Sequence, residues 1–482
     1  MKRKGILLKG EHARTITRAY FPGDLPRLEV LIERLAGLDD AAVAQLLESV
    51  IDDFGTRHRY FEETLVRSFE RLAERAPESR RLSPARQLLL GAYFTQEYSI
   101  ESAAFFNPSI VPHPDQADVA AGAQRFIMSF RATGEGHVSS IEFRSGVIDA
   151  AHELTFDPVS PYVETPQVHP DPAYSRLHFQ RKLEDIGAHA GVVDRLLEGL
   201  GEEFSLAQLQ QRIARLEPTR FRHGDKVAAI DAALWLARSN YECVFREDHR
   251  ISERVIFPVT ENEARGIEDA RFVRFTNDDG SVVYYATFTA YNGVAVLSQL
   301  LETTDFLTFK MRTLNGNAVS NKGMALFPRR IGGRYVMLSR QDGVNNYIMY
   351  SDNLLFWNDA TRMQEPTHPA QFMQIGNCGS PVETPEGWLL LIHGVGPMRC
   401  YTIWAVLLDL DDPARVIGRL DEPLLAPDEH ERDGYVPNAV YTCGCMLHGD
   451  ELIIPYGIAD QRCSVATIGL SGLLTRLRAA GA

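Results

Sequence analysis

Five short apolar runs, each beginning at a glycine and ending in polar or charged residues, recur along this 482-residue chain. The last three intervals between them are roughly 50–60 residues long, which is the scale at which propeller blades repeat. No helical segment repeats with them, so the pattern favours sheets arranged radially around an axis. A β-sandwich with a similar number of strands would not predict so long and regular a period. The copies are GAQRFIMSFRATGEG from Gly122, GSVVYYATFTAYNG from Gly280, GRYVMLSRQDG from Gly333, GWLLLIHGVG from Gly387 and GDELIIPYGIAD from Gly449.

The polar residues that end these runs fall at the same place in every copy. If each copy belongs to one blade, their side chains converge on a single central funnel. We therefore predict that this funnel is the functional site. The residues are Arg131, Tyr291, Arg340 with Asp342, His393 and Asp460.

Two other stretches carry helical periodicity, with apolar residues spaced three and four apart. They occupy roughly residues 24–100 and 172–240. We therefore predict a mainly β protein, a five-bladed β-propeller with an accessory α-helical region. The predicted domains are a helical N-terminal region at 1–100 and a catalytic propeller at 101–482, which a helical insertion interrupts at about 172–240.

Composition narrows the possible partners and the compartment. The formal net charge of −14 disfavours binding to nucleic acid, which requires a basic surface. No stretch approaches the roughly 20 apolar residues of a membrane span, and the N-terminal apolar run is too short for the core of a signal peptide. The six cysteines form no Cys-x-x-Cys pair, which favours buried free thiols over a metal site. We expect a cytoplasmic protein with no nucleic-acid or membrane partner.

The densest group of charged residues is Arg265-Gly266-Ile267-Glu268-Asp269-Ala270-Arg271, directly before an apolar strand. Consecutive residues of an extended segment point to opposite faces, so we expect only one of Glu268 and Asp269 to face the funnel. From spacing alone, an exposed turn held by surface ion pairs is an equally good interpretation.

The same segment resembles the Glu-Asp-Pro-Arg motif of glycoside hydrolase family 130, the five-bladed β-propeller mannoside phosphorylases and β-mannosidases, with Ala270 in place of the proline. Further matches to that family follow in the family's order and cover about residues 101–145 and 250–475. They are Phe106-Asn107-Pro108-Ser109, Met324 to Pro328 with Gly333 to Arg340, Gly387 to Val395, and Tyr435 to Asn438 with Tyr456 to Asp460.

The resemblance implies a role for each matched residue. Asp269 takes the place of the family's general acid, which protonates the leaving oxygen and can do so through a sugar hydroxyl. Lys322, Arg340 and His393 fall on the positions that hold inorganic phosphate, whereas Gln374 replaces a lysine there. Contacts to the sugar are expected from Asn107, Arg131, Glu268, Arg271, Asp342 and Asp460.

The sequence thus predicts an inverting glycoside phosphorylase that cleaves β-mannosides with inorganic phosphate and releases mannose 1-phosphate. The alternative is an inverting β-mannosidase, which needs a second carboxylate from Asp342, Glu383 or Asp460 to activate water. A carbohydrate-binding propeller without catalysis is the third interpretation. We expect an oligosaccharide substrate, phosphate as co-substrate, no metal or organic cofactor, and a possible homo-oligomer formed through the helical region.

Overall fold

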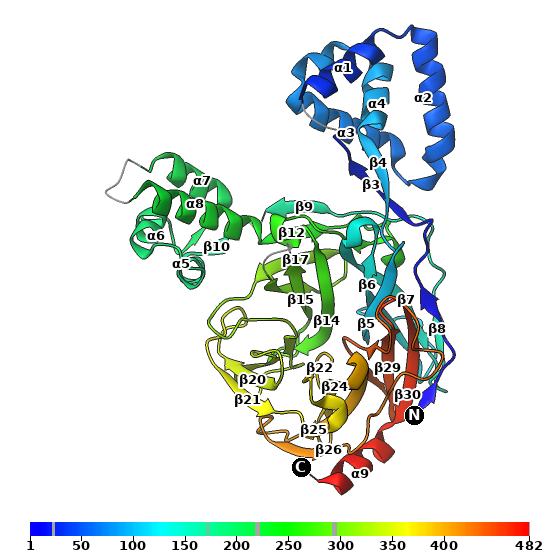
Figure 1. The fold of residues 1–482 in the computed structure, drawn as a ribbon, viewed down its shortest axis with the longest axis vertical. Helices are drawn as coiled ribbons and strands as arrows, with labels where there is room; N and C mark the ends of the chain where they lie inside the picture. Colours follow the sequence, from blue (N-terminus) through cyan, green and yellow to red (C-terminus); the bar gives the residue numbers. More distant parts are fainter. Residues whose placement is uncertain (22–24, 171–172, 217–221, 292–295, 482) are drawn as a thin grey trace.

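The computed structural model describes residues 1–482 except 22–24, 171–172, 217–221, 292–295 and 482. Residues 292 and 293, which end the copy that begins at Gly280, therefore lie outside the described chain, as does part of the predicted insertion. The described chain is mainly β, as expected, with helices in two separate groups and one at the C-terminus (Figure 1). Within it, no helix is both long enough and apolar enough to cross a membrane.

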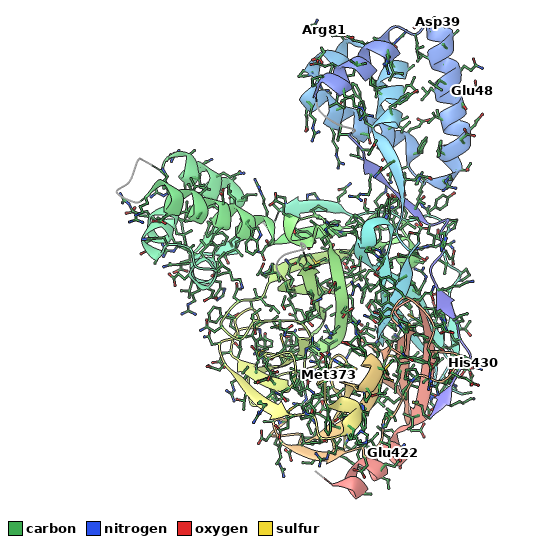
Figure 2. The ribbon with its side chains drawn as sticks, viewed as in Figure 1. Asp39, Glu48, Arg81, Met373, Glu422 and His430 are labelled. Atoms are coloured by element: carbon green, nitrogen blue, oxygen red, sulfur yellow. The ribbon has the colours of Figure 1, made fainter. Side chains whose placement is uncertain are left out.

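The first helical group packs around a core of its own, which includes Leu28, Phe69, Leu72 and Leu90. Asp39 caps its second helix by accepting a hydrogen bond from the backbone N–H of Ala42. A two-stranded ribbon joins the group to the sheets, and the surface residues Asp39, Glu48 and Arg81 lie on its outer side (Figure 2). The elements are β3 (Thr15–Ala19), α1 (Leu25–Ala36), α2 (Asp40–Phe54), α3 (Phe61–Arg75), α4 (Pro84–Tyr93) and β4 (Thr95–Ser99).

The second helical group lies beside the sheets, apart from the first group in Figure 1. It also has its own core, with Phe179, Leu196 and Leu236 among the buried side chains. The elements are β10 (Tyr174–Ser175), α5 (Arg176–Asp185), α6 (Ala190–Leu197), β11 (Glu203–Phe204), α7 (Leu206–Ala214) and α8 (His223–Arg238).

The largest sheet has eleven strands and contains two antiparallel sets that meet where β14 pairs with β7. The first set is β5 (Ala104–Pro112), β6 (Gln124–Thr133), β7 (Ser139–Ile148) and β8 (Leu154–Phe156), with β13 (Val255–Ile256) also paired to β7. The second set is β14 (Gly266–Thr276), β15 (Val282–Tyr291), β16 (Val296–Thr303), β17 (Thr308–Thr313), β12 (Tyr241–Val244) and β9 (Gln167–Pro170).

Three smaller sheets follow along the chain. The four-stranded sheet is β18 (Ala325–Leu326), β19 (Tyr335–Ser339), β20 (Asn346–Ser351) and β21 (Ala360–Gln364). The five-stranded sheet is β22 (Gln374–Asn377), β24 (Gly387–Val395), β25 (Tyr401–Leu408) and β26 (Val416–Arg419), with β23 (Val382–Thr384) on β24. The six-stranded sheet is β27 (Val440–Tyr441), β29 (Glu451–Ile458), β30 (Arg462–Gly469) and β1 (Lys2–Arg3), with β2 (Leu8–Lys9) and β28 (Met446–His448) at its edges, and α9 (Leu470–Ala480) follows β30.

The five apolar runs of the sequence occupy equivalent positions in these sheets. They are β6, β15, β19, β24 and β29, and each pairs with a strand that precedes it, namely β5, β14, β18, β22 and β27. Since the runs are bordered by strands on both sides, their near-continuous burial matches their apolar composition. In Figure 1 the labels of β5, β14, β22, β24 and β29 surround the middle of the β region.

Candidate active site

A cavity of about 280 Å³ lies where residues from all the larger sheets meet. Nine of the ten site residues predicted from the sequence line it, although they come from segments up to 350 positions apart. They are Asn107, Arg131, Glu268, Asp269, Arg271, Lys322, Arg340, His393 and Asp460. We call this space the central cavity.

Both carboxylates of the Glu268-Asp269 pair line the central cavity, so the expectation that only one of them could do so was wrong. The register of β14 against β15 shifts between Glu268 and Arg271, which marks a β-bulge. At the bulge Asp269 adopts a φ of 54°, a left-handed conformation that breaks the alternation of side chains along the strand. The bulge therefore brings two adjacent carboxylates to one side.

Left-handed backbone recurs at the cavity in residues other than glycine. Asn107, Arg399 and Asp460 have φ values of 49°, 54° and 50°, and all three line the cavity with Asp269. Each such conformation costs on the order of 1–3 kcal/mol, and strain of this kind clusters at functional sites. Since β5 also shifts register between Phe106 and Ser109, Asn107 is presented by a bulge as well.

Asp269 is held by three groups. Asn107 Nδ2 donates a hydrogen bond to Oδ1 over 2.7 Å, Arg131 Nη1 lies 3.5 Å from Oδ1, and Arg271 Nη2 lies 3.9 Å from Oδ2. Burial raises the pKa of the Asp269 carboxyl, but the two guanidinium groups and the amide together outweigh it and leave the pKa below its usual value. Asp269 is therefore a carboxylate in the unliganded cavity.

Asp460 has the opposite electrostatic environment. Burial and the negative charge of Asp269 raise the pKa of its carboxyl to about 6, against the smaller effects of Arg131 and Arg399. These two carboxyl groups of the central cavity thus differ. That of Asp269 is ionised across the neutral pH range, whereas that of Asp460 titrates close to neutral pH. Divergence of this kind between neighbouring carboxyls is typical of sites that move protons.

The raised pKa of Asp460 makes stability depend on pH. Because the folded-state pKa lies above the unfolded value of about 3.8, the wild-type free energy of unfolding is expected to decrease as pH rises from about 4 to 6. One pKa unit corresponds to about 1.4 kcal/mol, so Asp460→Asn should raise the free energy of unfolding by up to about 3 kcal/mol at pH 7.5 and by little at pH 4. Urea unfolding at both pH values measures this, with the exposed Asp52→Asn as control. Equal effects of Asp460→Asn at the two pH values would contradict it.

Lys322 does not present a free ammonium group to the cavity. Its Nζ forms an ion pair with Glu268, which also accepts a hydrogen bond from Arg131 Nη2 over 2.9 Å. The prediction that Lys322 contributes a positive charge to an anion site therefore needs correction, because Glu268 neutralises that charge. Glu268 in turn holds both cations on one side of the cavity.

His393 is buried and uncharged. Burial, together with the guanidinium groups of Arg340 and Arg271, lowers the pKa of its imidazole to about 3. The family resemblance places His393 among the residues that hold phosphate, and at neutral pH it can do so only with a ring N–H, since the imidazole carries no charge. Gly376 makes room for the ring, since a Cβ at that position would lie 2.3 Å from His393 Cε1.

Arg340 and the exposed Arg399 line the cavity without a salt bridge to any described residue, and Arg340 is the one beside His393. The structure gives it no salt bridge to any described carboxylate, and its Nη1 has only the ring of His393 at 3.5 Å. Its Nε, the Nε of Arg271 and the Nδ1 of His393 are buried and lack a hydrogen-bond partner among the described residues. Arg131 Nε and Asn107 Oδ1, which also belong to residues of this cavity, likewise have no partner among the described residues. Buried polar groups nearly always have partners, so the cavity suits a polar ligand whose oxygens accept hydrogen bonds from the arginines.

Two carboxylates considered as partners for Asp269 lie elsewhere. Asp342 is not among the residues that line the cavity, because its carboxylate caps a turn and accepts hydrogen bonds from the backbone N–H groups of Val344 and Asn345 at 2.9 and 2.8 Å. Asp342 thus lies outside the central cavity, and its role as a sugar contact stays a prediction. Glu383 accepts two hydrogen bonds from Arg329, at 2.8 and 2.6 Å, on the surface.

Several cavity residues were not singled out from the sequence. Tyr441 accepts a hydrogen bond from Arg271 Nη2 over 2.8 Å, and Arg399, Tyr401 and Asn377 also line the space. Arg399 and Tyr401 follow the end of β24 by a few residues, so the rule that polar side chains gather after the apolar runs could have found them. Tyr441 lies on a two-residue strand that has no apolar pattern of its own.

Among the described residues, no group of three or more His, Cys, Asp or Glu side chains is placed to hold a metal ion. All six cysteines are free. Cys378 and Cys443 lie close enough to Arg271 to interact with its charge, and burial raises the pKa of both thiols above the usual value.

Comparison with known proteins identifies the family of this chain. A family model described as β-1,4-mannooligosaccharide phosphorylase, glycoside hydrolase family 130, matches residues 238–478. That range contains the bulge at Asp269, Lys322, Arg340, His393 and Asp460. The chain belongs to glycoside hydrolase family 130. The resemblance noted in the sequence is thus confirmed.

The relatives of this family-130 chain include characterised phosphorylases. It is 33% identical over 229 residues to a 1,2-β-oligomannan phosphorylase from Thermoanaerobacter sp. (strain X514), covering 46% of this chain and 75% of that protein. It is 31% identical over 232 residues to a β-1,2-mannobiose phosphorylase from Listeria innocua, covering 46% and 63%. A solved structure of the Listeria innocua β-1,2-mannobiose phosphorylase in complex with β-1,2-mannobiose is similar at 22% identity and a TM-score of 0.46, over 78% of this chain and 92% of that one.

Proposed function

We propose that this family-130 protein is an inverting phosphorylase that transfers the mannosyl group of a β-mannoside to inorganic phosphate. The observation that carries the proposal is the unpaired Arg340 guanidinium beside buried donors of Arg271 and His393 that lack partners. A phosphate anion supplies acceptor oxygens to such donors and arrives as a nucleophile that needs no general base. The matched family model and the phosphorylases among the relatives support the same reaction.

In this mechanism a phosphate oxygen attacks the anomeric carbon from the face opposite the leaving group. The bond from that carbon to the glycosidic oxygen breaks, and the oxygen takes a proton from Asp269, directly or through a sugar hydroxyl. The products are mannose 1-phosphate with inverted configuration and the shortened acceptor sugar. Asn107 holds Asp269, while Arg131, Glu268 and Asp460 are placed to contact sugar hydroxyls.

An acid role for Asp269 requires its pKa to rise when the cavity is filled. In the unliganded cavity two guanidinium groups keep the pKa low. Bound phosphate adds negative charge next to Arg340 and Arg271, and a nearby anion raises the pKa of a carboxyl. We infer that phosphate serves as nucleophile and also favours the protonated form of Asp269.

The hydrolytic alternative rests on one specific observation. Asp460 is a second carboxyl group in the central cavity, and its pKa of about 6 suits a general base near neutral pH. An inverting hydrolase requires such a pair. Phosphorolysis remains the preferred proposal because a hydrolase has no use for the unpaired Arg340.

We also propose that the sheets form a five-bladed β-propeller at 101–482. Five hydrophobic clusters support this, because each joins one strand set to the next and one joins the last set to the first. They are represented by Phe143 with Phe272, Phe275 with Met337, Leu338 with Leu390, Leu391 with Ile454, and Phe130 with Val465. On this view α1–α4 are an accessory domain within 1–100 and α5–α8 are an insertion at about 172–240. The cytoplasmic location and the homo-oligomer stay predictions.

The function is tested by incubating the full chain with β-1,2- and β-1,4-mannobiose, with and without inorganic phosphate. We expect mannose 1-phosphate and free mannose in equal amounts with phosphate, and at least about a hundredfold slower cleavage without it. Anomer-resolved NMR of the product identifies the inversion. Release of mannose at the same rate in both conditions, with no sugar phosphate, would establish the hydrolase instead.

A further inference from the structure

A second hollow, of about 360 Å³, lies between the second helical group and the sheet that carries Asp269. Its walls come from α5 and α8 on one side and from the start of β16 and the segment 316–321 on the other. Residues of α5 and α8 precede 238–478, the range that matches the family model. The hollow is therefore formed in part by residues outside the range that matches the family model.

Hydrogen bonds fix α5 against the far wall of the hollow. Lys182 Nζ donates to the carbonyl oxygen of Leu314 over 3.2 Å, and the backbone N–H of Gly316 donates to Asp185 Oδ2 over 3.2 Å. Lys182 is buried although it is a lysine, which is unusual without a functional or structural reason. The hollow thus has a defined shape set by two polar contacts.

The second hollow and the central cavity share a wall. Asn321 lines the hollow and its neighbour Lys322 lines the cavity, while Ser298 Oγ holds this wall by donating to the carbonyl oxygen of Asn321 over 3.0 Å. Across the sheet, Thr289 pairs with Glu268 on one side and with Ser298 on the other. Two strand spacings, roughly 10 Å, therefore separate a cavity residue from a residue of the hollow.

The side chains of the hollow suit a sugar. Trp235 packs on the core of the second helical group and still lines the hollow, whereas the other three tryptophans of the chain are buried. Asn317 and Asn321 are exposed beside it and offer amide donors and acceptors. An aromatic ring that receives the C–H face of a pyranose, with polar groups around it for the hydroxyls, is the combination a saccharide subsite requires.

We propose that this hollow is a second saccharide subsite, which receives the distal sugars of a β-mannoside oligosaccharide whose terminal unit occupies the central cavity. Trp235 provides the stacking surface, and Asn317 and Asn321 bind hydroxyl groups. The inference rests on the proposed function and adds to it a preference for oligosaccharides over disaccharides.

Binding is measured first, in the full-length Asp269→Asn variant, so that no substrate is consumed. Isothermal titration calorimetry with mannobiose and mannotetraose of each linkage, β-1,2 and β-1,4, measures the affinities, and tryptophan fluorescence is recorded in the proteins that keep Trp235. We expect the tetraose of the preferred linkage to bind about tenfold more tightly than the biose, a ratio equal to about 1.4 kcal/mol, and to change the emission of Trp235. Adding Trp235→Ala or Asn317→Ala should bring the tetraose affinity close to that of the biose.

The control variant is Tyr93→Ala on α4, which removes an exposed aromatic ring in the first helical group and should leave the ratio unchanged. Asn317 is exposed, so its variant keeps the test valid if loss of Trp235 lowers the melting temperature. With Asp269 restored, Trp235→Ala should phosphorolyse mannobiose at the wild-type kcat/KM. Equal affinity for biose and tetraose, or a tetraose preference that survives both substitutions, would overturn the subsite. Failure of the wild type to cleave any mannoside would instead refute the proposed function. The ratio of the tetraose affinity to the biose affinity would still test the subsite in that case.

Discussion

Replacement of Asp269 with asparagine is expected to lower kcat for phosphorolysis by about a thousandfold, in the range found for loss of a general acid. The glycosidic oxygen would then leave without a proton. Asparagine keeps the shape of the side chain, and Arg131 retains Glu268 while Arg271 retains Tyr441. The variant should therefore fold and bind sugar. Release of mannose 1-phosphate measures the loss, with Asp115→Asn, an exposed carboxylate, as control.

The leaving group separates an acid from a purely electrostatic role for Asp269. A nitrophenyl β-mannoside departs as a stable anion and needs little protonation, so its cleavage by Asp269→Asn should fall by much less than that of mannobiose. An equal loss on both substrates would assign Asp269 to binding or charge stabilisation. Full activity on mannobiose would remove it from the mechanism.

Arg340→Gln is expected to reduce kcat/KM for phosphate about a hundredfold and to leave the Kd for mannobiose within about twofold. Hydrogen bonds to a charged group contribute about 1.5–3 kcal/mol, and a hundredfold corresponds to about 2.7 kcal/mol. Arg340 is the appropriate target because it has no salt bridge among the described residues that its removal would disrupt. Initial rates at varied phosphate and fixed mannobiose measure the effect.

Arg329→Gln is the matched control for Arg340, because this arginine pairs with Glu383 on the surface and does not line the cavity. It should behave as wild type. An unchanged phosphate dependence in Arg340→Gln would place the anion elsewhere in the cavity. A drop in mannobiose affinity with no change for phosphate would make Arg340 a sugar ligand.

The strand repeat could be read from the sequence because strands of this kind are buried on both faces and show as short apolar runs between turn residues. Each of the five runs is a strand, and the polar residues that end them are mostly drawn to one cavity. Arg131, Arg340, His393 and Asp460 could therefore be named together. Asp342 lies apart from them because its carboxylate, three residues past the end of β19, caps the turn itself.

The charge states at the site could not be read in the same way. Lys322 and Glu268 are 54 positions apart and Arg340 and His393 are 53 apart, so their interactions arise only when the sheets assemble. Burial then removes the charge of His393, and Glu268 neutralises Lys322. A count of basic residues in the motifs overstated the positive charge available to phosphate.

The sequence by itself determined the strand repeat, the family and the identity of half of the residues that line the cavity, because these depend on local apolar patterns and on motifs of a few adjacent residues. The tertiary structure decided the geometry and the electrostatics. A bulge at Asp269 places two adjacent carboxylates on one side, against the alternation that a regular strand imposes. Long-range packing leaves Arg340 without a salt bridge among the described residues and gives Asp269 and Asp460 different pKa values, because burial and neighbouring charges act through space and not along the chain.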